Sequence, residues 1–336
     1  MLYSAVDLGG SSGRVTVGQL KDEKILLTEV HRFKHEPIQT KDGLFWDWQF
    51  LVEQVITGLK AATKLGRIHS VGIDSWAVDY GLIDKSGAVI SQPYCYRDAR
   101  TDGVMAKLKE ELGVDYIYSK TGIQFIFFNT MYQLFIEKES TAYKNADKFL
   151  MVPDLLNYLL CGSISTEITN ASTTQLLNVH TRDWDWQIIE KLGIKKDIFP
   201  KINKPKQEMG VITGYGELDG IKVISVGSHD TASAVAGTPL PESGDAAYIS
   251  SGTWSLVGLE LKAPVTDQKA MDFNITNEMG VEDRIRFIKN VAGMWLLEES
   301  LDYWAKSGQN YTAAQLAQEA ALLPKGAVID ANDPRF

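Results

Sequence analysis

The sequence predicts a mixed α/β protein with two domains. Three strand-like runs follow one another within residues 2–33, and a helical pattern comes next at 47–64. One arrangement occurs twice, at 2–20 and at 246–260: an apolar strand, a small glycine-bearing turn and a second strand. A chain of 336 residues is also long enough for two cores. Together these observations favour two related α/β units.

The composition is that of a globular protein that does not bind nucleic acid. Apolar residues make up 44% of the chain and charged residues 23%, and the formal net charge is −9, whereas a nucleic-acid-binding protein usually has a basic face. No apolar run is long enough to span a membrane, and MLYSAVDLGG is unlike a secretory signal. Cys95 and Cys161 are too few for a disulfide framework or a zinc site, so we expect a reducing, cytoplasmic setting.

The first 90 residues are predicted to form strands around one helix. Residues 2–7 are apolar and lead into the turn GGSSG, residues 14–20 alternate, and ILLTEVHRF follows a polar turn. This pattern predicts an antiparallel meander. Residues 47–64 carry apolar side chains at helical spacing, and SVGID at 70–74 is a further strand that ends on a carboxylate.

The middle of the chain is predicted to be mainly helical. The helical pattern extends from residue 101 to about residue 160, and its last helix begins at Pro153, a favoured first position. The stretch 161–186 is polar and predicts loops and short strands. KVISVGSHD, at 222–230, predicts a strand followed by a helix.

The second domain is predicted to open with a hairpin. Prolines interrupt the pattern within 238–245, which is the best place for a domain boundary. DAAYISSGTWSLVGLEL, at 245–261, then reads as two strands joined at SSGT. A strand at 285–289 and a helix at 293–305 follow.

The strongest motif is DLGGSSGR, at residues 7–14. Two interpretations are open. Its backbone N–H groups can cradle phosphates while Arg14 reaches a phosphate oxygen and Asp7 holds a hydrated Mg²⁺, or its glycines simply supply positive φ for a tight hairpin. It lacks the spacing of a Walker loop. ISSGTWS, at 249–255, has similar chemistry, and two such turns favour a phosphate clamp between two domains.

Other segments are rich in polar groups. GIDSWAVDY, at 72–80, places Trp76 near two carboxylates, which suits a sugar-binding face, although a core role is the commoner one for a tryptophan. FNTMYQL and TNASTTQLLN suit either a polyol site or a buried hydrogen-bond network. In GSHDTASA, Asp230 either caps a helix or does chemistry on a ligand. The histidines lack metal-ligand spacing.

These motifs, in this number and order, resemble the FGGY carbohydrate kinases. The resemblance rests on DLGGSSGRV, GIDSWAVDY, YRDART, FNTMYQL, TNASTTQL, SHDTASAV, AYISSGTWSL, NITNE and KNVAGMWLL. It implies an actin-like, ribonuclease-H-like pair of α/β domains around a cleft. Residues 1–238 would form the N-terminal domain, which binds sugar and phosphate. Residues 239–336 would begin the nucleotide-binding C-terminal domain, which the resemblance implies is incomplete, with the adenosine-binding region outside this chain.

The resemblance also implies an activity, cofactors and site residues. The activity is ATP-dependent phosphorylation of the C1 hydroxyl of L-rhamnulose, with Asp230 as general base and Mg²⁺ near Asp7. The implied phosphate and nucleotide contacts are Gly10, Ser11, Ser12, Gly13, Arg14, Thr253 and Glu298, the last replacing a glutamine. The implied sugar contacts are Trp76, Ala77, His229, Thr231 and Asn290.

Alternatives remain open at this point. A methyl group at Ala77, where similar sequences often have glycine, can shift the preferred substrate toward another ketose or polyol, such as xylulose or glycerol. A non-catalytic sugar-binding remnant is the third interpretation, because the adenosine-binding region is missing. Sugar binding without phosphate transfer would distinguish that remnant from a kinase.

Overall fold

The computed structural model describes residues 1–252, 254–326 and 328, and its main element is a six-stranded sheet. In spatial order the strands are β14 (Glu208–Val211), β15 (Lys222–Ile224), β6 (Ile68–Ser75), β1 (Leu2–Leu8), β2 (Ser12–Lys21) and β3 (Lys24–Lys34). The predicted meander is confirmed, because β1, β2 and β3 pair antiparallel. β6 pairs parallel to β1 on one side and to β15 on the other.

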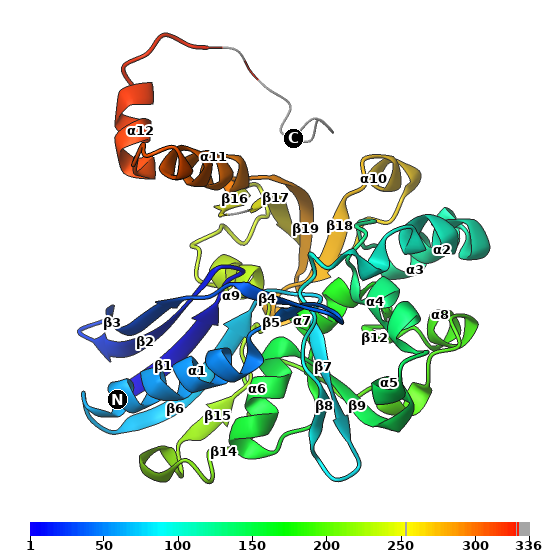
Figure 1. Ribbon diagram of the computed structural model, residues 1–336, viewed down its shortest axis with the longest axis horizontal. Helices are drawn as coiled ribbons and strands as arrows, with labels where there is room; N and C mark the ends of the chain where they lie inside the picture. The colour runs from blue at the N-terminus through cyan, green and yellow to red at the C-terminus, as the bar shows by residue number, and fades with distance from the viewer. Residues whose placement is uncertain (253, 327, 329–336) are drawn as a thin grey trace.

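A four-stranded sheet forms the second layer and lies above the six-stranded sheet in Figure 1. Its order is β16 (Ala247–Ser251), β17 (Trp254–Leu261), β19 (Ile285–Ala292) and β18 (Thr276–Met279), all antiparallel. The predicted hairpin at 245–261 and the predicted strand at 285–289 are therefore confirmed. The predicted boundary at residue 238 stays a prediction.

A three-stranded sheet and three two-stranded ribbons complete the β structure. The sheet contains β8 (Val89–Ser91), β7 (Tyr80–Asp84) and β9 (Ala146–Met151). The ribbons are β4 (Pro37–Thr40) with β5 (Gly43–Trp46), β10 (Thr166–Glu167) with β13 (Ile202–Asn203), and β11 (Leu177–Asn178) with β12 (Asp183–Trp184). β9 lies in a stretch that was predicted to be helical, and its partner β7 lies more than sixty residues earlier in the chain.

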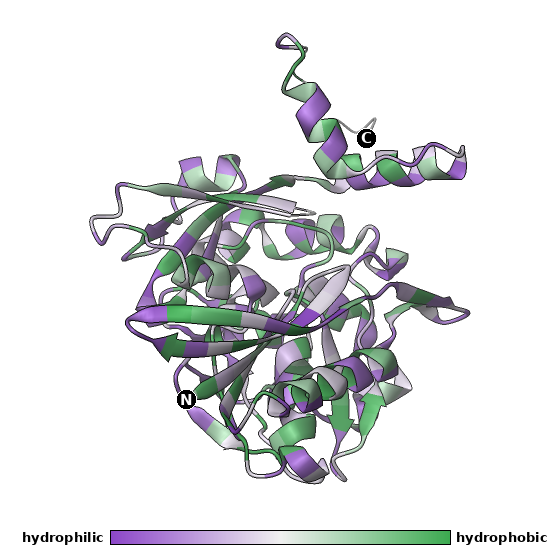
Figure 2. Ribbon diagram, turned by 90° about the vertical axis from the view of Figure 1, so that its left-hand side faces the viewer, coloured by the Kyte–Doolittle hydropathy of each residue, from purple (hydrophilic) through white to green (hydrophobic). Residues whose placement is uncertain are grey.

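The α-helices cover the sheets and connect them. They are α1 (Trp48–Thr63), α2 (Val104–Leu112), α3 (Val114–Thr121), α4 (Thr130–Glu137), α5 (Thr141–Asn145), α6 (Val152–Cys161), α7 (Ile168–Ala171), α8 (Trp186–Lys191), α9 (Asp230–Ala236), α10 (Gln268–Asp272), α11 (Trp295–Lys306) and α12 (Ala313–Ala320). Short 3₁₀ turns occupy Ala99–Thr101, Ser172–Thr174, Lys196–Ile198, Gly216–Leu218 and Val281–Asp283. Figure 2 shows that α11 and α12, at the C-terminal end, carry both hydrophobic and hydrophilic segments.

Helix α1 illustrates how the sequence builds these elements. The side chain of Asp47 caps it by accepting from the N–H of Phe50 at 3.1 Å. Its buried residues recur at helical spacing, from Trp48 and Leu51 to Val55, and face the six-stranded sheet. A Cβ at Gly58 would lie 2.3 Å from Val15 Cγ2, so glycine is needed for the close approach of helix and sheet.

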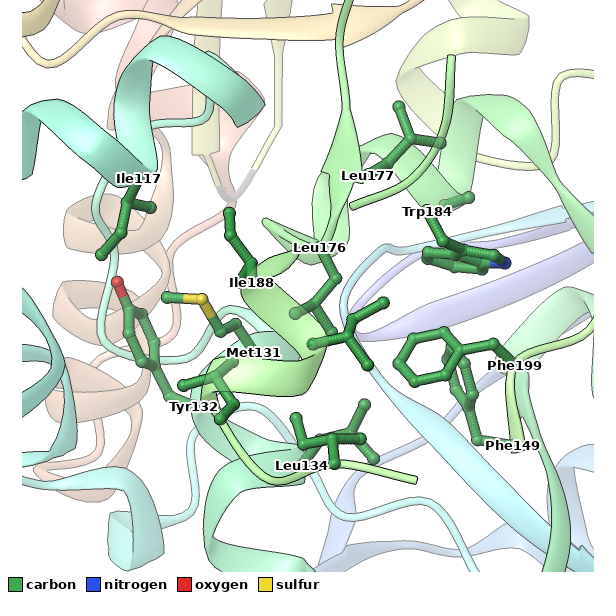
Figure 3. Packing of buried hydrophobic residues seen from close by; sticks show 14 of the residues in the cluster. Ile117, Met131, Tyr132, Leu134, Phe149, Leu176, Leu177, Trp184, Ile188 and Phe199 are labelled. Carbon is green, nitrogen blue, oxygen red and sulfur yellow. The ribbon is translucent and has the colours of Figure 1, made fainter. Parts of the chain in front are cut away.

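Two hydrophobic clusters hold the layers together. One fills the space between the six-stranded sheet, α1 and α6. The other surrounds α4, β9 and α8, and Figure 3 shows its packing around Met131, Phe149 and Trp184. Met279 and Ile285 of the four-stranded sheet belong to this second cluster, so apolar contacts join that sheet to the helices and to the three-stranded sheet. Among the described residues, no helix has the length and apolar character needed to cross a membrane.

Candidate functional site

A cavity of about 390 Å³ lies between the two large sheets. It is lined from the first sheet and its connections by Asp7, Gly9, Gly10, Ser11, Arg14, Trp76, Ala77, Val78, Tyr96, Ile123, Gln124, Ile126, Phe128, Asn129, Thr173, His229, Asp230, Thr231 and Ala234. The second sheet contributes Ser250, Ser251, Gly252, Trp254, Leu256, Thr276, Glu278 and Asn290. The cavity therefore brings together most of the residues predicted for a site.

The turn 9–12 between β1 and β2 forms one wall. The N–H of Gly9 donates to the carbonyl of Ser12 at 2.9 Å, and the carbonyl of Gly9 lies 2.8 Å from His35 Nε2. Gly9, Gly10 and Ser11 reach the cavity, whereas Ser12 and Gly13 belong to β2 and do not line it. The role of His35 as a brace for this turn has no signal in the motif itself.

The interpretation that these glycines supply positive φ is wrong. Gly9, Gly10 and Gly13 all lie outside the positive-φ region. Gly13 is required for space instead, since a Cβ there would come 2.3 Å from Phe33 Cζ and 2.7 Å from Leu8 Cδ2. A Cβ at Gly10 would lie 3.2 Å from the hydroxyl of Tyr96, which also lines the cavity.

Asp7 and Arg14 sit opposite each other on β1 and β2. Arg14 donates from Nη2 at 2.5 Å and from Nε at 2.8 Å to the same oxygen of Asp7. Asp74, at the end of β6, is the register partner of Asp7 on the other side. Burial, together with the negative charges of Asp7 and Asp230, raises the pKa of Asp74 well above its usual value. Carboxylates therefore concentrate negative charge at this edge of the sheet.

Asp230 is the first residue of α9, one position after the N-cap, which His229 occupies, so the interpretation of Asp230 as the helix cap is wrong. Its Oδ1 accepts from the N–H of Thr231 at 2.6 Å and from the Thr231 hydroxyl at 3.2 Å. The side chain is 32% exposed, so a ligand in the cavity can reach its free oxygen. Burial raises the pKa of Asp230, although His229 and the Thr231 N–H lower it. A raised carboxylate pKa suits a proton acceptor.

His229 connects Asp230 to the second sheet. Its Nε2 lies 3.4 Å from Asp230 Oδ1, and its Nδ1 lies 3.1 Å from Glu278 Oε2 and 2.9 Å from Arg286 Nη2. Burial alone would raise the pKa of Glu278, but opposing effects, led by the positive charge of Arg286, lower it. Glu278 is the last residue of the motif NITNE. Neither Glu278 nor Arg286 was predicted to belong to the site.

The segment 76–79 forms the wall beside Asp230. Trp76 is both buried and part of the cavity lining, so its core and site interpretations hold together. Asp79 accepts from the indole N–H groups of Trp46 at 2.7 Å and of Trp76 at 3.0 Å. Val78, with φ 66, lies in the left-handed region that β-branched residues avoid. Its carbonyl accepts from the Thr130 hydroxyl at 2.7 Å, which helps to hold this backbone in place.

The polar segments 128–134 and 169–178 have both predicted roles. Asn129 and Thr173 line the cavity. Asn129 also donates to Gln175 Oε1 at 3.1 Å within a buried network, and Thr169 and Asn170 are fully buried. Amide and hydroxyl groups therefore support the wall as well as face the cavity.

The second turn completes the site. Ser250, Ser251 and Gly252 line the cavity, and Thr253 lies outside the described residues. Trp254 contacts Phe128 across the cavity, with ring centroids 6.2 Å apart. Glu298 is exposed on α11 and does not line the cavity.

Comparisons with known families give consistent results. Residues 2–237 match the model of the FGGY family of carbohydrate kinases, N-terminal domain, and residues 247–336 match that of its C-terminal domain. A rhamnulokinase from Mannheimia succiniciproducens is 47% identical over 298 residues, covering 87% of this chain and 61% of that protein. A rhamnulokinase from Bacillus subtilis is 43% identical over 342 residues, covering 100% and 70%. The chain thus spans 61% to 70% of the length of these relatives.

Solved structures show the same fold. A ligand-bound xylulose kinase from Lactobacillus acidophilus superposes with a TM-score of 0.80 at 18% identity, covering 96% of this chain and 66% of that chain. A glycerol kinase from Plasmodium falciparum with ADP gives 0.75 at 16% identity, covering 89% and 64%. At these identities the likeness concerns the fold alone. It confirms the predicted two-domain α/β fold of the sugar kinases.

Proposed function

The chain belongs to the FGGY family of carbohydrate kinases, and we propose that it transfers the γ-phosphate of ATP to the C1 hydroxyl of L-rhamnulose. The observation that carries this proposal is the position of Asp230 in a cavity that two glycine-bearing turns close from opposite sheets. The names of the relatives at 43% and 47% identity support L-rhamnulose as the sugar.

In the proposed reaction Asp230 accepts the proton of the attacking hydroxyl. Its backbone is fixed at the start of α9, and Thr231 occupies one of its oxygens, which leaves the other for substrate. Phosphoryl transfer depends mainly on positioning and on neutralising charge, with a residue that takes the hydroxyl proton. Trp76 presents an apolar face and Asn290 a polar side chain for the sugar from opposite sides of the cavity.

The phosphates are assigned to the end of the cavity formed by the two turns. Gly10 and Ser11 from one sheet would supply backbone N–H groups there, while Ser250 and Ser251 from the other would supply hydroxyl groups, because the N–H of Gly252 already donates to the carbonyl of Trp254 at 2.8 Å. Arg14 is half exposed and already points into this region, so it can exchange part of its contact with Asp7 for a phosphate oxygen. The proposed roles of Ser12, Gly13 and Glu298 would require contacts from outside the cavity lining.

The residues also fit a magnesium ion. Mg²⁺ prefers one or two carboxylates, with water and phosphate oxygens completing the shell. Asp7 lines the cavity and is 31% exposed, and the raised pKa of Asp74 reflects its burial and the negative charges of Asp7 and Asp230. Asp7 would hold the ion. A bound Mg²⁺ would neutralise part of the negative charge of the phosphates.

Isothermal titration calorimetry with L-rhamnulose, D-xylulose and glycerol tests the substrate. We expect L-rhamnulose to bind selectively, and a coupled assay for ADP to report turnover with the same sugar. Ala77 lines the cavity, so its methyl group can alter which sugar fits. Selective binding of another polyol would show that the preferred substrate is that polyol and not L-rhamnulose. Selective sugar binding without ADP production would instead support the non-catalytic interpretation. An Ala77→Gly variant is the matched control for the added methyl group.

A further inference from the structure

A buried arginine reaches the site from the second sheet. Arg286 lies on β19, is 0% exposed, and is the register partner of Glu278 on β18. Its Nε donates to the carbonyl of Met279 at 3.2 Å, while its Nη2 lies 2.9 Å from Nδ1 of His229 and 3.0 Å from Oε2 of Glu278. Arg286 does not line the cavity, so any effect on a substrate must pass through the residues that it contacts there, His229 and Glu278.

The contact between Arg286 and His229 determines where the imidazole proton is. A guanidinium has N–H donors and no acceptor. A ring nitrogen 2.9 Å from Nη2 must therefore accept, so Nδ1 of His229 carries no proton. In a neutral imidazole the other nitrogen is then the donor. That atom, Nε2, is the one that lies 3.4 Å from Asp230 Oδ1.

Glu278 alone would favour the opposite arrangement. Its Oε2 is 3.1 Å from Nδ1 of His229, where it would accept from an Nδ1–H. A proton on Nδ1 would also face the N–H groups of Arg286 Nη2, and two donors at 2.9 Å cannot form a hydrogen bond. Oε2 instead lies 3.0 Å from Nη2 of Arg286 and serves as its counter-ion. A buried arginine requires a counter-ion of this kind. The ion pair of Arg286 with Glu278 therefore agrees with an unprotonated Nδ1 in His229.

We infer that Arg286, neutralised by Glu278, holds His229 in the Nε2–H tautomer and so makes His229 a hydrogen-bond donor beside Asp230. The two neighbouring side chains then have different tasks: Asp230 accepts a proton and His229 donates to an adjacent oxygen of the substrate. Arg286 is a positioning residue. The tautomer follows from the contacts alone, while its use on a sugar rests on the proposed function.

This arrangement also links the tautomer to the position of the second sheet. Arg286 and Glu278 come from β19 and β18, whereas His229 and Asp230 come from the start of α9. Main-chain contacts hold the sheet in place near this point, since the N–H of Asn277 donates to the carbonyl of Gly122 at 2.8 Å. The contact that fixes the donor role of His229 therefore forms only when the second sheet lies against the start of α9.

Nitrogen-15 NMR of the histidine side chains tests the tautomer directly, because protonated and unprotonated ring nitrogens resonate far apart. The full chain is labelled at its five histidines, and a His229→Gln variant assigns the signals. At neutral pH we expect a protonated Nε2 and an unprotonated Nδ1 in His229. An Nδ1–H tautomer, or a doubly protonated ring, would overturn the inference without any reference to activity.

Two variants separate Arg286 from Glu278. In Arg286→Met the donor to Nδ1 is lost while volume is roughly kept, so Glu278 becomes the partner and His229 should switch to the Nδ1–H tautomer. In Glu278→Gln the guanidinium still donates, so the Nε2–H tautomer should persist. An unchanged tautomer in a folded Arg286→Met protein would refute the role of Arg286. If that variant does not fold, the wild-type and Glu278→Gln spectra decide the question.

Calorimetry adds the functional consequence. If His229 donates to the sugar, Arg286→Met should bind L-rhamnulose about tenfold more weakly, the effect of about one hydrogen bond. Equal affinity in wild type and Arg286→Met, despite a switched tautomer, would overturn the assignment of His229 as a sugar donor. Failure of the wild-type protein to bind L-rhamnulose would count against the proposed substrate, while the tautomer result would stand.

Discussion

The buried carboxylate of Asp79 provides the sharpest test of the energetics, through the change Asp79→Asn. Asp79 is 1% exposed, and its Oδ2 accepts from Trp46, Trp76 and the N–H of Tyr96 at 2.7, 3.0 and 3.1 Å. Its Oδ1 accepts from Gln133 Nε2 at 3.0 Å. Burial raises the pKa of Asp79 from 3.8 to about 6, against the opposing effect of these donors.

The magnitude follows from linkage. A folded-state pKa about two units above the unfolded value corresponds to about 3 kcal/mol of stability. Because the pKa is raised, this stability is fully present below pH 3.8 and is lost as pH rises through about 6. Asparagine does not titrate. The stability of Asp79→Asn relative to wild type should therefore rise by about 3 kcal/mol between about pH 3 and pH 8.

Asparagine also brings a constant cost that does not affect this slope. The asparagine oxygen can accept from the three donors that Oδ2 now accepts from, but its NH₂ group then faces Gln133 Nε2, which is also a donor. Gln133 cannot turn its amide round to relieve this, because its Oε1 accepts from Arg100 at 2.7 Å. The lost bond costs about 1–3 kcal/mol at every pH. The comparison therefore depends on the change with pH and not on the absolute difference.

Urea unfolding of both proteins across this pH range gives the measurement. Asp84→Asn is the matched control on the same strand, because Asp84 is only partly buried and hydrogen bonds from Ser86 lower its pKa. A lowered pKa contributes stability that is lost as pH falls, so this control should show a slope of the opposite sign. A pH-independent difference between wild type and Asp79→Asn would refute the reasoning.

Three further changes test the site. Asp230→Asn should lower turnover about 10²–10⁴-fold while sugar still binds in calorimetry, and near-normal turnover would exclude Asp230 as the base. Gly13→Ala places a Cβ 2.3 Å from Phe33 and should cost about 1–3 kcal/mol in urea unfolding. Gly9→Ala, with 3.5 Å of clearance, should cost much less, and equal costs would contradict the steric argument. Arg14→Ala should change stability by no more than about 1 kcal/mol, since its ion pair with Asp7 is half exposed, but should weaken binding of Mg²⁺–ATP. Unchanged nucleotide affinity would remove Arg14 from the phosphate site.

The sequence predicted the features that depend on local patterns. The N-terminal meander, α1 and the hairpin β16–β17 follow from residue alternation, helical spacing and turn residues over short windows. The resemblance to the FGGY carbohydrate kinases placed Asp7 and Asp230 at a common site, and each stands where a predicted strand ends or gives way to a helix. Side chains at such points meet when their strands lie in one sheet, as Asp7 and Asp74 do.

Features that depend on distant pairing were missed. ADKFLM at β9 has no strong strand signal and becomes a strand because β7 pairs with it. The contact between His229 and Arg286 joins residues 57 positions apart. The sequence alone does not distinguish a buried arginine from one on the surface. One of the two interpretations of the first turn gave its glycines a conformational role, whereas Gly13 is needed because Phe33, on another strand, leaves no space for a Cβ.

The charge balance of the cavity constrains what can enter it. Among the described lining residues the carboxylates of Asp7, Asp230 and Glu278 face a single guanidinium, that of Arg14. Arg286 compensates Glu278 from behind the wall, which leaves Asp7 and Asp230 in excess of Arg14. A bare polyphosphate would be repelled by such a site, while a neutral sugar would not, and a divalent cation would reverse the sign for the phosphate. The cavity therefore admits sugar freely and, on the proposed function, accepts ATP as its magnesium complex, since the ion supplies the positive charge that the cavity lining lacks.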